Sequence, residues 1–315
     1  MKILVTGGAG FIGSHFVERA LNGLYPEISD VVVVDKLTYA GKMSNMKNFF
    51  QYKNFHFVQG DICDSSLINE LVPTVDAVVN FAAESHVDRS IQDSSEFIMT
   101  NILGTAVLLN AAKNFKIRKF IQISTDEVYG SVLKGSSKED DLLLPNSPYS
   151  ASKASADMLA LSYFSTFGLN INITRCSNNY GPRQDAEKMI PKSITNLLQN
   201  KKIPIYGDGL NVRDWLFVSD HCDGVNLVLT KGMPGEIYNI GGGDELTNLE
   251  LVNELLRVFG ISSEHIEFVE DRLGHDRRYS VDYSKIANLG YSPKKQFQQG
   301  LTETISWYES SLNPK

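Results

Sequence analysis

The chain has 315 residues, of which 42% are hydrophobic, and a formal net charge of −7. It is long enough to bury a large core and to form more than one domain. The acidic balance, with no run of basic residues, argues against nucleic-acid binding.

The cysteines and histidines indicate neither a disulfide framework nor a metal site. Cys63, Cys176 and Cys222 are scattered, which is typical of a reducing compartment. The six histidines show no HxxxH or HExxH spacing. The apolar run at the N-terminus is too short for a signal peptide, and no stretch approaches the roughly 20 apolar residues that span a bilayer. We therefore expect a cytoplasmic protein that is not inserted in a membrane.

Short apolar runs alternate with helix-like segments through the first half of the chain. We expect buried strands at 3–5, 31–34, 55–58, 77–79 and 120–123, and a further strand at 170–174. Helices are expected at 12–22, 95–114 and 149–167, the last between Pro148 and Gly168. Near-continuous apolar strands separated by helices predict a parallel sheet covered on both faces. This is an α/β fold with a doubly wound parallel (Rossmann) sheet.

Beyond residue 174 the alternation loosens, and segments rich in Gly, Pro and Asn interrupt the remainder. We expect residues 1–180 to form the Rossmann domain, with parts of 211–240 returning to it. Residues 181–315 are expected to form mainly a smaller C-terminal substrate-binding lobe.

A glycine-rich turn follows the first strand and opens the first helix. Gly7, Gly10 and Gly13 permit a tight turn and a close approach of the backbone to a pyrophosphate, which the helix N-terminus also favours. Asp35 ends the second strand, where a carboxylate binds the ribose 2′-hydroxyl of NAD and repels the 2′-phosphate of NADP. We therefore expect NAD, although the neighbouring Lys36 leaves NADP open.

Two groups of residues indicate the chemistry. Tyr149 and Lys153 lie four residues apart in a helical pattern and share a helix face. A lysine ammonium there favours the tyrosine phenolate, which takes a proton from an alcohol. Thr125, Asp126 and Glu127 come at the end of a strand, where open α/β sheets bind ligands. Adjacent carboxylates can differ in pKa through burial and mutual repulsion, so the pair predicts that oxidation is the first step of a longer reaction.

Further motifs extend this pattern over nearly the whole chain. They are DKLTYAG at 35–41, AAESHVDRS at 82–90, STDEVYG at 124–130, CSNNYGP at 176–182, RDW at 213–215 and DRLGHDRRY at 271–279. In these motifs the chain resembles the extended short-chain dehydrogenase/reductase superfamily and, within it, the dTDP-glucose 4,6-dehydratases.

The resemblance implies a role for each catalytic candidate. Tyr149 would remove the proton of the glucose 4-hydroxyl as hydride passes from C4 to NAD. Lys153 would lower the tyrosine pKa, and Thr125 would bond the sugar oxygen at C4. Glu127 would then remove the C5 proton, and Asp126 would protonate the departing C6 hydroxyl. Return of the hydride to C6 would give the 4-keto-6-deoxy sugar with no net redox change.

The resemblance and the glycine turn together imply the contact residues. Cofactor contacts are expected at Gly7, Gly10, Phe11, Ile12, Gly13, Asp35, Lys36, Leu37, Thr38, Asp61, Ile62, Ala82, Ala83, Thr100, Tyr149, Lys153 and Asn179. Sugar-nucleotide contacts are expected at Ser85, Thr125, Asn178, Lys188, Met189, Pro204, Tyr206, Arg213, Asn248, Arg272 and His275. Two arginines suit a diphosphate, because a planar guanidinium bonds its oxygens in a bidentate way.

Other functions share some of these motifs. The same elimination could act on another NDP-hexose. An NAD-dependent nucleotide-sugar 4-epimerase would use Tyr149 and Lys153 but leave Asp126 and Glu127 without a role. A non-enzymatic dinucleotide-binding regulator leaves the tyrosine–lysine pair unexplained. As in relatives, the helices at 95–114 and 149–167 are expected to form the four-helix interface of a homodimer.

Overall fold

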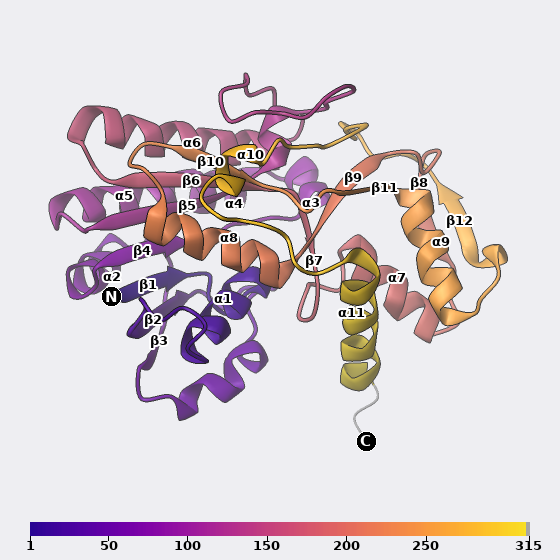
Figure 1. Ribbon diagram of the computed structural model, residues 1–315, viewed down its shortest axis with the longest axis horizontal. Helices are drawn as coiled ribbons and strands as arrows, with labels where there is room; N and C mark the ends of the chain where they lie inside the picture. Colours follow the sequence, from indigo (N-terminus) through magenta and orange to yellow (C-terminus); the bar gives the residue numbers. More distant parts are fainter. Residues whose placement is uncertain (313–315) are drawn as a thin grey trace.

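The computed structural model describes residues 1–312. Its main sheet has seven strands in the order β10-β6-β5-β4-β1-β2-β3, all parallel (Figure 1). These strands are β1 (Lys2–Thr6), β2 (Asp30–Asp35), β3 (Phe55–Gln59), β4 (Ala77–Asn80), β5 (Lys119–Thr125), β6 (Ile171–Cys176) and β10 (Ile237–Ile240). The predicted doubly wound sheet is confirmed. Its strand order reverses between β1 and β4, which is where such sheets bind ligands.

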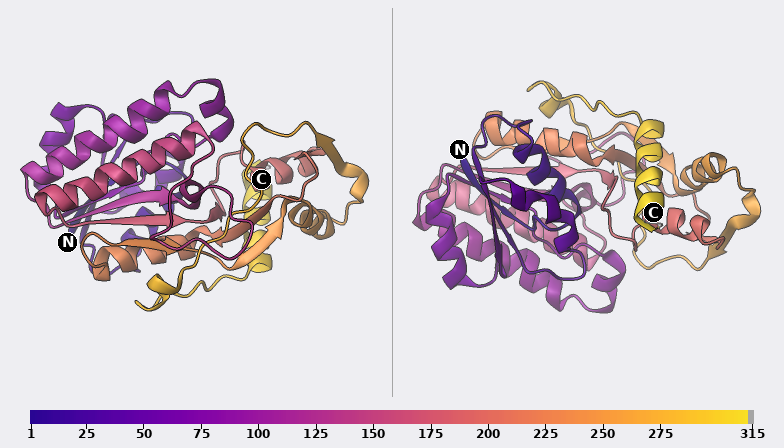
Figure 2. Two further views of the ribbon diagram at one scale, coloured as in Figure 1. Left: turned by 90° about the horizontal axis from the view of Figure 1, so that it is seen from above. Right: turned by 90° about the horizontal axis from the view of Figure 1, so that it is seen from below.

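Helices cover both faces of this sheet (Figure 2). Alternate side chains of a strand point to opposite faces, so Ile3 and Val5 pack into one layer and Leu4 into the other. The first layer contains α1 (Phe11–Leu21) and α8 (Val218–Lys231). The second contains α2 (Ser65–Leu71), α5 (Thr105–Asn114) and α6 (Pro148–Phe167). Because both faces are buried, the strands are apolar along almost their whole length.

The helical segment Ser95–Asn114 is built from three consecutive elements. α4 (Ser95–Phe97), the π-helical η3 (Ile98–Gly104) and α5 follow one another directly. By length and composition alone, this segment is apolar enough to cross a membrane, with a mean hydropathy of 1.2. Such a helix is weak evidence for a membrane span, because the core helix of a globular domain passes the same test. Leu108 and Leu109 are fully buried in the layer against the main sheet, as in the core helix of a globular domain.

Helix α6 carries the predicted tyrosine and lysine, and local sequence sets both of its ends. Ser147 and Ser150 form a capping box at the start, followed by proline in the first turn. Gly168 ends the helix in the left-handed conformation, with φ of +68°. The helix therefore begins one residue before the predicted range and ends where predicted.

A buried ion pair joins α6 to the main sheet behind the site. Arg175 on β6 donates from Nε to Oδ2 of Asp157 on α6 at 2.9 Å, and both side chains are at most 2% exposed. Arg175 also donates to the hydroxyl of Tyr129, which donates to Asn239 on β10. Removing one partner of such a pair costs about 3–5 kcal/mol, because the other charge stays buried. The pair therefore holds α6 in one place against the sheet.

The rest of the chain builds a second group of elements beside the main sheet (Figure 1). One small sheet contains β7 (Asn178–Tyr180), β9 (Val212–Phe217) and β11 (Asp244–Thr247), and another contains β8 (Ile203–Tyr206) and β12 (Ile266–Val269). The accompanying helices are α7 (Met189–Leu198), α9 (Asn248–Phe259) and α11 (Phe297–Leu312). Shorter elements are η1 (Met43–Gln51), η2 (Val72–Thr74), α3 (Val87–Gln92), η4 (Asp126–Tyr129), η5 (Ser263–His265) and α10 (Ser284–Ala287).

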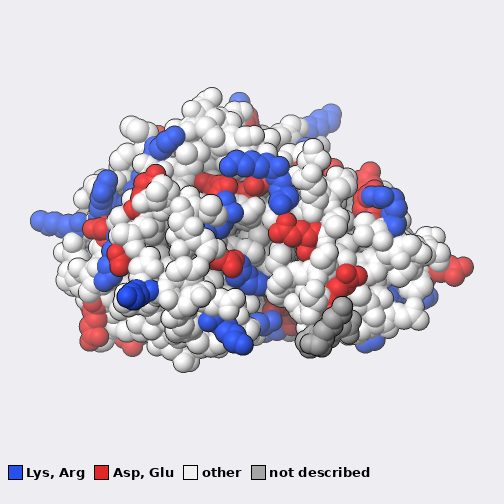
Figure 3. All heavy atoms as spheres, turned by 60° about the horizontal axis from the view of Figure 1, so that its bottom comes forward, with Lys and Arg blue, Asp and Glu red and all other residues white. Residues whose placement is uncertain are grey.

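Charges of both signs are interspersed over the face of the molecule drawn in Figure 3. Cys63, Cys176 and Cys222 are all free thiols. Within residues 1–312, no group of three His, Cys, Asp or Glu side chains is arranged to hold a metal ion.

Candidate active site

Two adjoining cavities open at the carboxyl ends of the main-sheet strands. The first has a volume of about 290 Å³ and is lined by the glycine turn, the end of β2 and the catalytic candidates. The second, of about 990 Å³, lies between α3 and the second group of elements. Both cavities share a set of wall residues, namely Glu84, Glu127, Asn178, Asn179, Gln184 and Lys188. A ligand with two chemically different parts can therefore span one continuous space.

The glycine turn brings the start of α1 to the wall of the first cavity. Gly7 has φ of +68°, and a Cβ there would lie 2.7 Å from the backbone N of Ala82. A Cβ at Gly13 would lie 2.3 Å from the carbonyl oxygen of Gly7. No side chain caps the helix at Gly10, and its first turn holds no acidic residue. The free N–H groups and the helix dipole can therefore receive an anion.

Asp35 lies at the end of β2 and lines the first cavity. Its carboxylate accepts hydrogen bonds from the backbone N–H groups of Ala9 at 2.9 Å and Leu37 at 2.8 Å. Burial raises its pKa, and these two N–H groups oppose the rise. The neighbouring Lys36 forms an ion pair with Asp61 at 2.8 Å. A carboxylate at this position with its nearest lysine already paired suits a ribose diol better than a phosphate.

The catalytic candidates gather in the first cavity. Thr125 ends β5, and its hydroxyl accepts from the N–H of Glu127 at 3.3 Å and donates to Asp126 at 3.2 Å. Tyr149 and Lys153 approach from the first two turns of α6. All five residues line this cavity, and Glu127 also lines the second.

The two adjacent carboxyl groups have different electrostatic surroundings. Asp126 is 3% exposed, and burial together with the charge of Glu127 raises its pKa well above the ordinary value. Burial also raises the pKa of Glu127, but Arg272, Lys188 and Arg213 oppose that rise. The Oδ2 atom of Asp126 is buried without a hydrogen-bond partner among the described residues. This arrangement favours a protonated Asp126 beside an ionised Glu127, a pair that can serve as acid and base.

Burial has the largest effect on the pKa of Tyr149. Burial and the charge of Glu127 raise it well above the ordinary value for tyrosine. A hydrogen bond with Thr125 opposes this rise. The ammonium of Lys153 donates to the carbonyl oxygen of Ile123, and burial lowers the lysine pKa. In the chain by itself the tyrosine is therefore a phenol. A phenolate would require additional positive charge in the pocket.

Cationic side chains surround Glu127 at the junction of the two cavities. Lys188 donates to the carbonyl oxygen of Ser85 at 2.7 Å. Arg213 donates to two backbone carbonyl groups, and its guanidinium lies 4.3 Å from the ring centroid of Tyr279. Arg272 reaches in from the loop after β12, and its Nε is buried without a partner among the described residues. These groups can neutralise a diphosphate.

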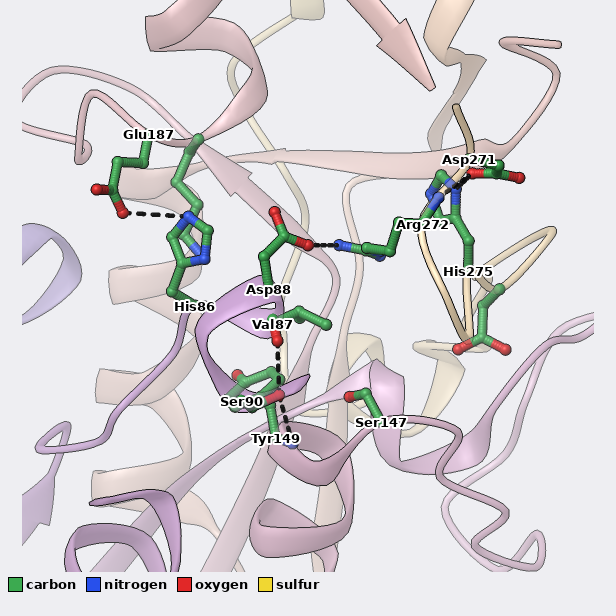
Figure 4. Close-up of polar contacts among 12 residues, drawn as sticks. His86, Val87, Asp88, Ser90, Ser147, Tyr149, Glu187, Asp271, Arg272 and His275 are labelled. Atoms are coloured by element: carbon green, nitrogen blue, oxygen red, sulfur yellow. Dashed lines mark hydrogen bonds and ion pairs between the residues drawn. The ribbon is translucent and has the colours of Figure 1, made fainter. Parts of the chain in front are cut away.

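Helix α3 links the tyrosine to the rim of the second cavity (Figure 4). The hydroxyl of Ser90 accepts a hydrogen bond from the backbone N–H of Tyr149 at 3.2 Å. Two residues earlier, Asp88 faces Arg272, with 3.7 Å between carboxylate oxygen and guanidinium nitrogen. The start of α6 and the cationic loop are thus both attached to this short helix.

A second ion pair closes the rim on the other side of α3. Figure 4 shows His86 pointing toward Glu187. Its Nε2 lies 3.2 Å from one carboxylate oxygen, and Arg89 donates to the other oxygen at 2.7 Å. The guanidinium of Arg89 also lies 3.9 Å from the ring centroid of Tyr39. Three chain segments far apart in sequence therefore meet at the cavity mouth.

The predicted contact residues fall into these two cavities with one exception. The first cavity is lined by the predicted cofactor residues Gly7, Gly10, Phe11, Ile12, Gly13, Asp35, Lys36, Thr38, Asp61, Ile62, Ala82, Ala83, Thr100 and Asn179, and also by Ser85. The second is lined by Asn178, Lys188, Met189, Pro204, Tyr206, Arg213, Asn248, Arg272 and His275. Leu37 lines neither of them: its side chain packs against the core and only its N–H reaches Asp35.

Some residues of the site were missed from sequence. Asn101, in the π-helical turn, donates to the carbonyl oxygen of Glu84 and to the hydroxyl of Ser152, and accepts from the N–H of Glu84. Ser152 in turn donates to the carbonyl oxygen of Tyr149 at 2.7 Å. The available signal was an amide within an apolar helix, because a buried polar group needs partners. A π-helical turn, often found at functional sites, is not visible in the sequence.

Comparison with known proteins agrees with this geometry. The sequence model of the GDP-mannose 4,6 dehydratase family matches residues 4–304. A dTDP-glucose 4,6-dehydratase from an Actinoplanes species is 55% identical, over 99% of this chain and 98% of that protein. The solved structure of DesIV, a dTDP-glucose 4,6-dehydratase from Streptomyces venezuelae with NAD bound, has a TM-score of 0.97 at 51% identity and covers 98% of this chain and 97% of that one.

The same fold also serves a related reaction. The structure of a UDP-glucuronic acid 4-epimerase from Bacillus cereus has a TM-score of 0.92 at 32% identity, with 99% of this chain and all of that chain covered. Fold likeness therefore does not separate dehydratases from epimerases. The family match and the high identities are decisive for membership: this chain belongs to the GDP-mannose 4,6 dehydratase family, within the extended short-chain dehydrogenase/reductase superfamily.

Proposed function

We propose that this protein is an NAD-dependent lyase that converts dTDP-glucose to dTDP-4-keto-6-deoxyglucose and water. The observation that carries the proposal is the buried Asp126–Glu127 pair, whose two carboxyl groups have opposite electrostatic surroundings beside Tyr149 and Thr125. An epimerase needs a single base, whereas an elimination needs a base and an acid. The dTDP-glucose 4,6-dehydratases at 50–55% identity support the same reaction.

The residues of the first cavity fit NAD. The uncapped start of α1 would take the pyrophosphate, and Asp35 would take the ribose hydroxyls. When bound, NAD takes hydride from sugar C4, returns it to C6 and brings a positively charged ring into the pocket. A positive charge near the phenol of Tyr149 would lower its raised pKa.

In the oxidation step, Tyr149 Oη removes the proton of the sugar 4-hydroxyl. The hydroxyl of Thr125 bonds the sugar oxygen at C4. In the structure without substrate, this hydroxyl donates to Asp126. Lys153 stays attached to the carbonyl oxygen of Ile123 and remains on the same helix face as the tyrosine. These groups keep the reacting oxygen within reach of one base. This fixed geometry raises the rate of proton transfer.

In the elimination step, the new ketone at C4 makes the C5 hydrogen acidic. The Glu127 carboxylate removes this proton, because neighbouring cations limit the rise of its pKa. Asp126, whose pKa burial and the charge of Glu127 raise well above the ordinary value, gives its proton to the departing C6 hydroxyl. One proton leaves C5 and one reaches the leaving oxygen, so water forms without added acid or base.

Two sets of residues in the second cavity would bind different parts of the substrate. Lys188, Arg213 and Arg272 would bind the diphosphate, and Arg272 would exchange its contact with Asp88 for a phosphate oxygen. Met189, Pro204, Tyr206, Asn248 and His275 line the same cavity and would enclose the nucleoside. Residues 1–180 with parts of 211–240 would thus hold the cofactor, and residues 181–315 mainly the sugar nucleotide.

A homodimer in the cytoplasm is part of the proposal. Ile98, Met99 and Leu103 on the 95–114 segment and Met158 on α6 are 45–65% exposed, which is high for apolar side chains. A second copy of the same two helices would cover them in a four-helix contact.

Product analysis tests the reaction and the nucleotide together. We expect the purified protein to convert dTDP-glucose to the 4-keto-6-deoxy sugar at a much higher rate than UDP-, CDP- or GDP-glucose. Mass spectrometry detects the loss of water, and the keto sugar absorbs in alkali. Formation of dTDP-galactose would contradict the elimination, and faster turnover of another NDP-glucose would contradict the nucleotide assignment.

Replacing the proposed base separates oxidation from elimination. In Glu127→Gln, the bound cofactor should still become reduced when dTDP-glucose is added, because Tyr149 is intact. Water loss should fall by about 10²–10⁴-fold, the usual contribution of a general base. Absorbance at the wavelength of reduced nicotinamide and product mass measure the two steps separately. Normal turnover of this variant would overturn the role of Glu127.

The pKa directions predict a bell-shaped rate profile. Activity should fall in acid as Glu127 becomes protonated, and in alkali as Asp126, whose pKa is raised, finally loses its proton. In Asp126→Asn, the amide has no proton to give, so water loss should be slower at every pH, and the residual rate should keep the acid limb but lose the alkaline limb. Rates of water loss measured over pH check this, and an unchanged alkaline limb in the variant would contradict the assignment.

Light scattering tests the dimer. We expect twice the mass of one chain for the wild-type protein and the mass of one chain for Met158→Glu, because a charge would be buried in the contact. A wild-type protein with the mass of one chain would exclude the interface.

A further inference from the structure

His221 is a fully buried histidine to which the proposed mechanism gives no role. It lies in the first turn of α8 with 0% of its surface exposed. Its Nδ1 lies 2.9 Å from Oδ1 of Asn179, a residue in the wall of both cavities. Burial lowers the pKa of His221 to about 3, so the imidazole is neutral near neutral pH.

The hydrogen bonds of Asn179 determine where the imidazole proton lies. Its Nδ2 donates to the carbonyl oxygen of Ser177 at 2.9 Å, and a carbonyl can only accept. This contact fixes which end of the amide is oxygen. Oδ1 then faces His221 and can only accept, so Nδ1 of the imidazole carries the hydrogen.

The same tautomer leaves the other ring nitrogen unpaired. Nε2 of His221 is buried and has no hydrogen-bond partner among the described residues. A buried acceptor without a partner lowers stability, and an apolar side chain of similar size would avoid this loss. Stability therefore does not explain a histidine at this position, whereas the single bond from Nδ1 to Asn179 does.

That bond fixes the plane of an amide at the cavity wall. Asn179 is held at Oδ1 by His221 and at one Nδ2 hydrogen by Ser177. Its backbone carbonyl accepts from Gln184 Nε2 at 2.8 Å, which anchors the main chain as well. The second Nδ2 hydrogen has no partner within residues 1–312. An amide fixed at both ends presents this hydrogen in one direction and loses little freedom when a ligand accepts it.

We infer that His221 is a positioning residue, which orients the amide of Asn179 so that its free N–H meets an acceptor atom of the bound dinucleotide. The inference rests on the proposed use of NAD. It concerns the affinity for the cofactor, not the proton transfers, because His221 lines neither cavity.

Two substitutions separate the hydrogen bond from the space that the ring fills. His221→Leu is apolar and of similar size, and it removes the donor. His221→Asn places an amide N–H near the position of Nδ1 and restores it. Val225→Ala, one turn further along α8 at another fully buried position, is the control for a general weakening of this helix.

Titration calorimetry of nucleotide-stripped protein with NAD gives the cofactor affinity, and thermal unfolding gives the stability. We expect the dissociation constant for NAD to rise about tenfold in His221→Leu, the effect of one lost hydrogen bond. Its melting temperature without NAD should equal or exceed that of the wild type. His221→Asn should bind NAD within about threefold of the wild type, and Val225→Ala should lose stability but keep wild-type affinity.

The outcomes that would overturn the inference are distinct. Wild-type affinity for NAD in His221→Leu would show that the bond to Asn179 is unimportant. Equal loss of affinity in His221→Asn would show that the donor is not what matters. A melting temperature of His221→Leu as low as that of Val225→Ala would indicate a structural role. Failure of the wild-type protein itself to bind NAD would contradict the proposed function and this inference with it.

Discussion

The site depends on one electrostatic constraint: two adjacent carboxyl groups are buried at the end of β5, where both cannot be ionised at low cost. Asp126 is the more deeply buried of the two, and the charge of Glu127 raises its pKa further. Glu127 stands where the cations of the second cavity oppose burial. A difference in surroundings, not in residue type, thus separates acid from base. If either carboxyl group were moved into solvent, the division of roles would be lost.

Both halves of the structure contribute to this constraint. The main sheet supplies the burial, because β5 is a central strand covered on both faces. The Arg175–Asp157 pair holds the neighbouring strand β6 against α6. The cations come from outside that sheet: Lys188 precedes α7, Arg213 lies on β9, and Arg272 lies in the loop after β12. The acid–base pair therefore exists only when the second group of elements is packed against the first. This explains why the reaction centre lies at their junction and not within either part.

Local signals predicted the main sheet and most of the candidate site. Apolar runs such as Val31–Val34 and the cap residues Ser147 and Gly168 act over a few residues, so they are readable from sequence. The other site residues were predicted from motifs that resemble those of a known family. The raised pKa of Tyr149 and the links made by Asn101, Ser90 and His221 were not predictable, because each depends on residues distant in sequence. The backbone contact from the N–H of Leu37 to Asp35 was not readable from sequence either.

The central claim is that hydrogen removed from C4 of the sugar ends on C6 of the same molecule, after the two acids have expelled water between these events. dTDP-glucose labelled with deuterium at C4 tests it directly. Wild-type protein is incubated with the labelled sugar, and the product is examined by NMR and mass spectrometry. We expect deuterium in the C6 methyl group, with one solvent-derived hydrogen at C5. Deuterium retained at C4 of an epimerised sugar, or lost to solvent, would contradict it.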